Sequence, residues 1–519
     1  MAIETGFNNL RFCAHFVSGS VFSAQLMFLL NAFVTVFWLV GFKTRLFGFL
    51  TWFLTFSLQS RNPIVLHSGD VFLRCVLFFC MFLPLGEKYS VDSALLKWKN
   101  LKVGNHICQE KGSRKNLVCN AATFSLLAQV CMVYIFSALL KSGSPWTKDL
   151  TATQLALNSY YFKMPLANFL LKFPSLLKLM TFLVLKWEMF APILFWIPFR
   201  THFFRSFACV GFMFLHLGLA LNLRLGLFFW STFFLYVALF PAQFWDWMDL
   251  KMKSKHKKFT VFVDTTKTVS CWIILFFCGI LLSETVEYSF SSSSDQKKNE
   301  IWMRIEDNNS IKYENMESLI VITGRSVFLY PLHFTLRMTP KCLLTIADSL
   351  VLWSNQILLG SCLQFCLGSI PPKKQGEQPK SKKNQQRRRE GWDRCFRLSS
   401  QVFVSLLIFY VLLYNLNSMF PQVLLPFFPQ FGTLAVLTGL DQHWGMFSPS
   451  PPPHNFWINM RGELVDDTVL ELFSEEGIFK WRGTEFTGNP PNPFHKSFRN
   501  HRWWKYFGYL FLILFMLFF

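Results

Sequence analysis

The chain has 519 residues, of which 52% are hydrophobic and only 16% are charged. Soluble domains carry about 25% charged residues, so this composition excludes an ordinary soluble protein and indicates a polytopic membrane protein. The net charge of +21 would suggest nucleic-acid binding in a soluble chain. Here the positive residues lie in short polar loops and no nucleic-acid motif is present, so we expect no nucleic-acid partner.

Apolar segments of about the length of a membrane-spanning helix recur along the chain. Each predicts a helix, because only a helix satisfies its own backbone polar groups within the bilayer. In chain order the segments cover about 19–41, 44–60, 71–85, 120–140, 176–199, 205–224, 226–245, 269–283, 347–369, 399–417 and 505–519. The expected fold is an all-α polytopic membrane protein of about 10–11 transmembrane helices with a small β-rich C-terminal extension on the outer face.

This pattern also predicts the domain organisation of the chain. The expected parts are a transmembrane core over 1–283, an outer loop over 284–346, helices over 347–417 interrupted by a basic linker at 371–398, an outer extension over 418–504, and a last helix over 505–519. The linker is rich in Pro, Gln and Lys, a composition that favours disorder.

The positive charges predict the orientation of these segments. Segments 86–118, 246–268 and 371–398 are basic and therefore cytoplasmic, and the number of intervening spans agrees. The opposite face then receives 284–346, which contains a glycosylation sequon at Asn308. We expect a multi-pass membrane protein, of the endoplasmic reticulum if eukaryotic and of the plasma membrane if bacterial.

Cysteine usage gives no indication of a metal site. Most of the 13 cysteines lie in apolar stretches, where a thiol behaves as a small hydrophobic group. Cys362 and Cys366 are four residues apart, but no histidine or second cysteine pair completes a ligand set, so we expect no metal.

Ionisable and amide side chains within or beside the apolar segments are rare and gather toward the outer face. A charge in hydrocarbon costs about 2.5–3.5 kcal/mol on insertion scales, so such groups usually face the bundle interior and pair with one another. The residues concerned are Asp70, Arg74, Lys141, Glu188, His216 and Asn222.

Each of these residues has a structural explanation beside a functional one. Lys141, at the end of an apolar segment, can extend its amine to the membrane edge, and Asp70 can cap a helix start. Glu188 is expected to pair with a nearby arginine. The functional interpretation is that a desolvated lysine acts as a neutral base toward a buried phenol or quinol. No hydrolase triad, P-loop or Rossmann glycine pattern is present.

Several of these stretches resemble a known family. The string SLQSRNPIVLHSGDVFLRCVLFFCMFLPLGEKYSVD (57–92) resembles the signature of the horizontally transferred transmembrane (HTTM) domain of the vitamin K-dependent gamma-carboxylase superfamily. YIFSALLKSGSPWTKDLTATQLAL (134–157), HLGLALNLRLGLFFW (216–230) and LDQHWGMFSPSPPP (440–453) extend the match.

The resemblance implies roles for individual residues. Lys141 matches the carboxylase lysine regarded as the base that deprotonates reduced vitamin K before oxygen addition, and Trp146 matches the tryptophan that follows it. By the same analogy His216 lies near the quinone pocket. We therefore take Lys141 and His216 as candidate catalytic residues, and Asp70, Arg74, Trp146 and Asn222 as candidate binding residues.

Three hypotheses remain open at this point. The first is a membrane enzyme that oxidises reduced vitamin K or another quinol, with oxygen as co-substrate and carbon dioxide only if carboxylation is retained. The second is a non-catalytic HTTM protein that binds a lipid or a protein partner. The third, a transporter, lacks the expected inverted repeats. Compared with the carboxylase, we expect only about eighty residues, 418–504, in place of its large lumenal domain, and no counterpart of its first helix. Lys141 distinguishes the first two hypotheses, because a base must be buried and unpaired, whereas a membrane-edge lysine must reach headgroups.

Overall fold

The computed structural model describes most of the chain, in segments separated by gaps. The described residues are 13–16, 19–87, 90–93, 95–96, 119–159, 162–253, 259–264, 270, 273, 277, 286–291, 301–307, 311–324, 330–356, 380–420, 431–454, 461–463, 465–467, 469–471 and 505. The predictions for Asn308, Cys362, Cys366 and residues 506–519 lie outside them.

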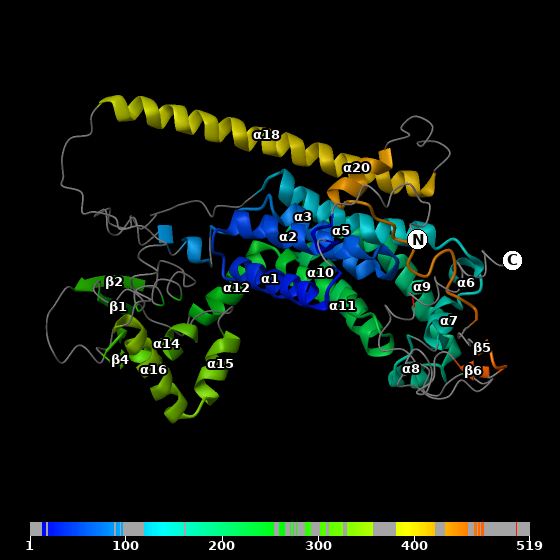
Figure 1. The fold of residues 1–519 in the computed structure, drawn as a ribbon, viewed down its shortest axis with the longest axis horizontal. Helices are drawn as coiled ribbons and strands as arrows, with labels where there is room; N and C mark the ends of the chain where they lie inside the picture. The colour runs from blue at the N-terminus through cyan, green and yellow to red at the C-terminus, as the bar shows by residue number, and fades with distance from the viewer. Residues whose placement is uncertain are drawn as a thin grey trace.

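A bundle of apolar helices forms the main body (Figure 1). Its long helices are α1 (Val21–Leu39), α2 (Thr44–Arg61), α3 (Ser68–Cys80), α5 (Ala121–Leu140), α9 (Pro174–Phe190), α10 (Thr201–Asn222), α11 (Leu227–Leu239) and α18 (Lys380–Met419). Helix α5 is the most enclosed of the four span-length helices and packs against α3, α9 and α18. The core is therefore built around α5.

Short elements connect the long helices. They are η2 (Ala14–Phe16), η3 (Pro63–Val65), α6 (Ser144–Thr147), α7 (Ala152–Asn158), α8 (Pro165–Leu170), η4 (Ala191–Phe195), α12 (Ala242–Lys253) and α20 (Phe431–Thr438). Helix α5 begins at a capping box, in which Asn120 Oδ1 accepts from the Thr123 N–H (2.9 Å) and Thr123 Oγ1 accepts from the Asn120 N–H (3.0 Å). These side chains satisfy two backbone N–H groups at the helix start.

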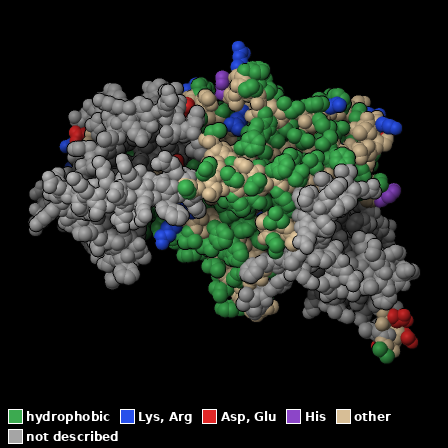
Figure 2. Space-filling model, turned by 90° about the horizontal axis from the view of Figure 1, so that it is seen from above, with side chains coloured by type: hydrophobic (Ala, Val, Ile, Leu, Met, Phe, Trp, Pro, Cys, Tyr) green, Lys and Arg blue, Asp and Glu red, His purple; other side chains and the backbone are tan. Residues whose placement is uncertain are grey.

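Within the described residues, four helices are long and apolar enough to cross a membrane: Val21–Leu39, Ala121–Leu140, Thr201–Asn222 and Leu398–Met419. Counting α11 and the start of α12 as one bent span gives five. Hydrophobic side chains cover much of the described surface in Figure 2, as expected for lipid contact. The helical prediction is confirmed, and the part of the chain that the structure describes contains four to five of the predicted 10–11 spans.

The predicted segment 226–245 is broken in the structure. Helix α11 ends at Leu239, and α12 leaves at an angle of 80° after Pro241. Proline has no N–H and its ring clashes with the preceding turn, so it ends a helix. The bend directs α12 away from the bundle axis.

The prediction of disorder in the basic linker is wrong for residues 380–398. Helix α18 runs without interruption from Lys380 to Met419, over 40 residues, or about 60 Å at 1.5 Å per residue. Its first half is rich in Lys, Arg and Gln, which are good helix formers, and contains no proline. The apolar second half packs on α5, which stabilises it as a helix. The charged half continues the same helix toward the N-terminus.

A four-stranded sheet follows the helical core, at the opposite end of the bundle from α6 and α7 (Figure 1). Its strands are β1 (Phe259–Asp264), β2 (Val286–Ser291), β3 (Arg304–Asp307) and β4 (Lys312–Glu314), in the order β2-β1-β3-β4. Helices α14 (Asn315–Thr323), α15 (Tyr330–Met338) and α16 (Lys341–Gln356) accompany it. Val261, Trp302 and Ile305 are among the buried residues of this unit.

The sheet overturns the prediction of a membrane span over 269–283. Strand β1 precedes that segment and β2 follows it, yet the two pair in parallel from Phe259↔Val286 to Asp264↔Ser291. Strands on opposite sides of a membrane cannot share hydrogen bonds, so both lie on one side. Ile273 and Phe277 pack against the buried cluster of this unit, as a crossover segment between parallel strands does. An apolar run of fewer than 18 residues is ambiguous between a buried crossover and a span.

Helix α16 also belongs to this unit rather than to the predicted span over 347–369. Leu344 and Val351 pack against the buried cluster. Asp348 Oδ1 accepts hydrogen bonds from Trp302 Nε1 (2.7 Å) and the Met316 N–H (3.0 Å). Burial raises the pKa of the Asp348 carboxyl above its usual value. The two hydrogen bonds lower this pKa, but the effect of burial is larger. This carboxyl fixes α16 to the start of α14 and to Trp302, which precedes β3.

A second, two-stranded sheet lies within the predicted C-terminal extension. Strands β5 (Arg461–Glu463) and β6 (Val469–Glu471) pair in antiparallel register. Residues 434–454 precede this hairpin and pack on the helical core instead, with Leu440 and Trp444 fully buried. Part of the region predicted as an extension is thus core.

The β1–β2 pairing predicts a specific cross-link. Thr260 and Glu287 are direct partners, and strands about 4.8 Å apart bring Cα atoms within the 4.4–6.8 Å disulfide range. The double variant Thr260→Cys/Glu287→Cys should form a disulfide, detected by mass spectrometry of linked peptides. Thr260→Cys/Ser289→Cys, offset by two residues, is the control and should not link. Absence of the 260–287 bond under oxidation would restore the span over 269–283.

Candidate functional site

Lys141 lies at the C-terminal end of α5 and its side chain is buried, with 4% of the residue exposed. Its Nζ donates to Oε2 of Glu188, which lies on α9 and is 6% exposed. The prediction that Glu188 pairs with an arginine is therefore wrong. The ion pair joins two helices 47 residues apart in the chain.

Trp146 completes the surroundings of the amine. Lys141 Nζ lies 4.8 Å from the centre of the Trp146 ring, a distance at which a ring face attracts a cation. The short helix α6 carries this ring, and Trp146 is 5% exposed. Two residues that the family resemblance selects, Lys141 and Trp146, are thus in contact.

Neither of the two alternatives drawn for Lys141 describes its position. A buried amine cannot reach headgroups, and an amine that donates to Glu188 is not unpaired. The pair places opposite charges in a poorly hydrated interior, where each depends on the other because an isolated buried charge costs several kcal/mol. Transfer of the proton from Lys141 to Glu188 converts the ion pair into a neutral amine and a neutral acid.

His216 lies in a second polar contact of the core. Its Nε2 and the Tyr134 hydroxyl share a hydrogen bond of 2.6 Å, and both residues are at most 2% exposed. Phe228 packs edge-on to His216 at 5.2 Å between ring centres, and Phe212 stacks on Tyr236 at 5.3 Å. Tyr134 precedes Lys141 by seven residues, two helical turns, so both lie on one face of α5.

The predicted binding residues Asp70, Arg74 and Asn222 have interactions of their own. Asp70 Oδ2 accepts from the His67 N–H (3.1 Å) in the capping box of α3, as expected for a helix start. Asn222 Nδ2 donates to the Gly218 carbonyl (2.8 Å). Arg74 Nη2 donates to the backbone carbonyl (2.8 Å) and Oδ1 (3.0 Å) of Asp441. Of the predicted binding residues, only Trp146 has a described contact with Lys141.

A polar stripe runs along α5 toward Lys141. Ser125, Gln129 and Ser137 precede it by 16, 12 and 4 residues, with the apolar Val133 between the last two, and are fully buried. Residues four apart share a helix face. Buried hydroxyls require hydrogen-bond partners, which ordered water supplies in protein interiors.

Several residues of the site were missed in the sequence. Tyr134, Gln129, Asp441 and Gln442 were not proposed as functional, although Tyr134 and Gln129 stand in an otherwise apolar segment. The four-residue spacing of polar residues in 125–141 was the available signal for Gln129. The partners Asp441 and Gln442 lie about 300 residues or more away, and no local pattern marks them.

Two observations bear on ligands. Among the described residues, no group of three or more His, Cys, Asp or Glu is arranged to hold a metal ion. A cavity of about 470 Å³ lies between α10 and α12, lined by Phe203, Phe207, Phe244 and Trp247 among others. It is at the first turns of α10, whereas His216 is near the opposite end of that helix.

Comparisons with known proteins identify no relative. No protein-family profile matches the chain, and neither a curated protein nor a solved structure matches it.

The Lys141–Glu188 pair predicts the stability of its variants. Glu188→Gln leaves the buried ammonium without a counter-charge and should cost about 3–5 kcal/mol of unfolding free energy. Replacing both partners, with Lys141→Met and Glu188→Leu, should recover most of that loss. Thermal unfolding of detergent-solubilised protein measures both. Lys186→Met on the exposed face of α9 is the control and should stay within about 0.5 kcal/mol. A wild-type melting temperature for Glu188→Gln would contradict a charged pair.

Proposed function

We propose that the chain is a multi-pass integral membrane protein related to the HTTM domain proteins. The apolar helices α1, α2, α3, α5, α9, α10 and α11 and the second half of α18 cross the bilayer. Helix α3 has 13 residues and lies within the bundle, packed by α2, α5 and α11, so its backbone need not meet lipid. Eight crossings return the chain to its starting side at residue 420.

In the proposed orientation the basic segments are cytoplasmic, as the sequence predicts. The four-stranded sheet lies on the same side as these segments, whereas the sequence analysis placed 284–346 on the outer side. Strand β1 lies within the basic segment 246–268, and β2, β3 and β4 are in the same sheet. The positive-inside rule therefore places 286–356 on the cytoplasmic side. The outer side receives α6, α7, α8 and residues 439–450.

This orientation predicts that Asn308 carries no glycan, because oligosaccharide is added on the lumenal side. Expression in a glycosylating cell followed by an endoglycosidase mobility assay measures this. The variant Tyr160→Thr completes a sequon at the exposed Asn158, at the end of α7, and should gain one glycan. A glycan that disappears in Asn308→Gln would place the sheet outside.

Within this membrane protein, we infer that Lys141 is a general base toward a reduced quinone-type lipid, with Glu188 as its proton acceptor. The observation that supports this is the burial of the amine against a carboxylate. Once Glu188 has taken the ammonium proton, the neutral amine can accept the hydroxyl proton of a quinol and leave the quinolate. Dioxygen is the oxidant: in the net reaction one oxygen atom enters the epoxide of the quinone, and the other leaves as water with the two hydroxyl hydrogens of the quinol. Aromatic side chains around Tyr134 and His216 suit a flat ring.

The 470 Å³ cavity and the Lys141–Glu188 ion pair favour a second candidate function, lipid binding without catalysis. An aromatic cavity between α10 and α12 suits an acyl chain or other lipid tail. In this alternative, the protein binds lipid without chemistry and the Lys141–Glu188 pair only joins α5 to α9.

Oxidation of reduced vitamin K distinguishes the two functions. Wild-type protein in lipid nanodiscs should form the epoxide, measured by chromatography, and Lys141→Ala should lose at least about 100-fold, the contribution of a general base. The charge-swapped variant, Lys141→Glu with Glu188→Lys, keeps the pair and should melt normally but remain inactive. Lys186→Ala is the control. Folded wild type that forms no epoxide, or an active Lys141→Ala, would favour lipid binding.

A further inference from the structure

A segment of the chain far from Lys141 in sequence lies across the helical core beside it. We call residues 439–450 the strap. It begins at Gly439, whose φ of +65° is readily adopted only by glycine. A Cβ at this position would lie 2.8 Å from the Phe56 ring and 3.1 Å from Arg74 Cδ, so the turn also requires a close approach to α2 and α3.

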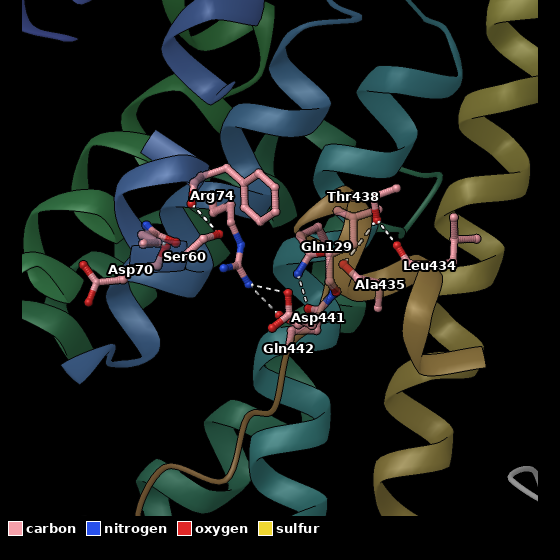
Figure 3. A network of polar contacts seen from close by, with 12 residues as sticks. Ser60, Asp70, Arg74, Gln129, Leu434, Ala435, Thr438, Asp441 and Gln442 are labelled. Carbon is pink, nitrogen blue, oxygen red and sulfur yellow. Dashed lines mark hydrogen bonds and ion pairs between the residues drawn. The ribbon is translucent and has the colours of Figure 1, made fainter. Parts of the chain in front are cut away.

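The first half of the strap is held by buried polar contacts (Figure 3). Arg74, with no exposed surface, donates through Nη2 to the carbonyl and Oδ1 of Asp441. Gln129 Nε2 of α5 donates to Gln442 Oε1 (2.7 Å), which also accepts from Trp444 Nε1 (2.8 Å). The charge-assisted hydrogen bonds of Arg74 contribute about 1.5–3 kcal/mol each, and those between the neutral side chains about 0.5–1.5 kcal/mol. Residues 441–444 are thereby fixed to α3 and α5.

The second half of the strap holds the turn that follows Lys141. The Phe447 carbonyl accepts from Trp146 Nε1 (2.9 Å), and the Pro449 carbonyl accepts from the Gly143 N–H (3.0 Å). A Cβ on Gly143 would lie 2.7 Å from the Pro449 carbonyl oxygen, so the two backbones are in close contact. The same tryptophan that bonds to the strap places its ring against the Lys141 amine.

These contacts form a continuous connection from Arg74 to Lys141. We propose that Arg74 and Asp441 are positioning residues, which fix the strap and thereby hold Trp146 and the Gly143 turn over the Lys141–Glu188 pair. The inference deepens the proposed function, because the base acts only if its amine is held away from water. Neither Arg74 nor Asp441 contacts the reacting groups in this scheme.

The test measures the accessibility of the Lys141 amine directly. Wild-type protein in nanodiscs is treated with a small amine-reactive reagent, and modification at Lys141 is followed by mass spectrometry over time. In Asp441→Ala the modification rate of Lys141 should rise at least about tenfold, as expected from losing a charge-assisted contact. Asp441→Glu, which keeps the carboxylate, should recover part of the protection.

Three comparisons make the result specific. Lys178 and Lys186, exposed on α9, should react at unchanged rates in every variant. Glu463→Ala removes an exposed carboxylate in β5 and should leave Lys141 protected. If Asp441→Ala does not fold, the milder Asp441→Asn replaces it, with the same direction expected.

The outcomes separate this inference from the proposed function. Unchanged labelling of Lys141 in a folded Asp441 variant would overturn the positioning role, as would a rise shared by Lys178 and Lys186. Labelling needs no turnover, so wild type that forms no epoxide refutes the base while leaving the positioning result valid. If epoxide is formed, Asp441→Ala should lower kcat more than it changes KM, because the strap acts on the base.

Discussion

Neutralisation of buried charge is the constraint on which the described core depends. Lys141 and Arg74 are both nearly inaccessible, and each is paired with a carboxylate from a distant segment, Glu188 on α9 and Asp441 in the strap. A buried cation without its partner would cost several kcal/mol. The pairs therefore determine which helices must meet: α5 with α9, and α3 with the strap. Apolar packing alone is less selective, because hydrophobic surfaces of similar volume are interchangeable.

The same constraint links the two ends of the chain. Arg74 and Asp441 are separated by 367 positions, and Gln129 and Gln442 by 313. Helix α18 packs along α5, and the strap follows it in the chain and contacts the turn after Lys141. The strap is thus part of the helical core. Removal of the strap would leave buried polar side chains of α3 and α5 without their hydrogen-bond partners.

Periodicity and charge in the sequence predicted the helices well and their partners poorly. The first six apolar segments correspond to α1, α2, α3, α5, α9 and α10, because apolar length and helix formation are local properties. Segment 269–283 was assigned wrongly, since pairing of β1 with β2 is set by contacts that no local pattern carries. Lys141 and Trp146 are five residues apart in the chain, so a local motif can select both, and their side chains are in contact. We predicted an arginine partner for Glu188 because no local pattern shows whether a lysine or an arginine pairs with it.

The pairing of Lys141 changes what a buried lysine implies. An unpaired amine in an apolar pocket becomes a base through desolvation alone. Here the amine donates to the carboxylate of Glu188 and lies against the ring of Trp146, so it has two partners within the core. In the proposed mechanism the free amine forms only when its proton moves to Glu188, and the proposal therefore requires the glutamate as well as the lysine. A site of this kind is controlled by the geometry of the pair, and that geometry depends on the turn that the strap holds in place.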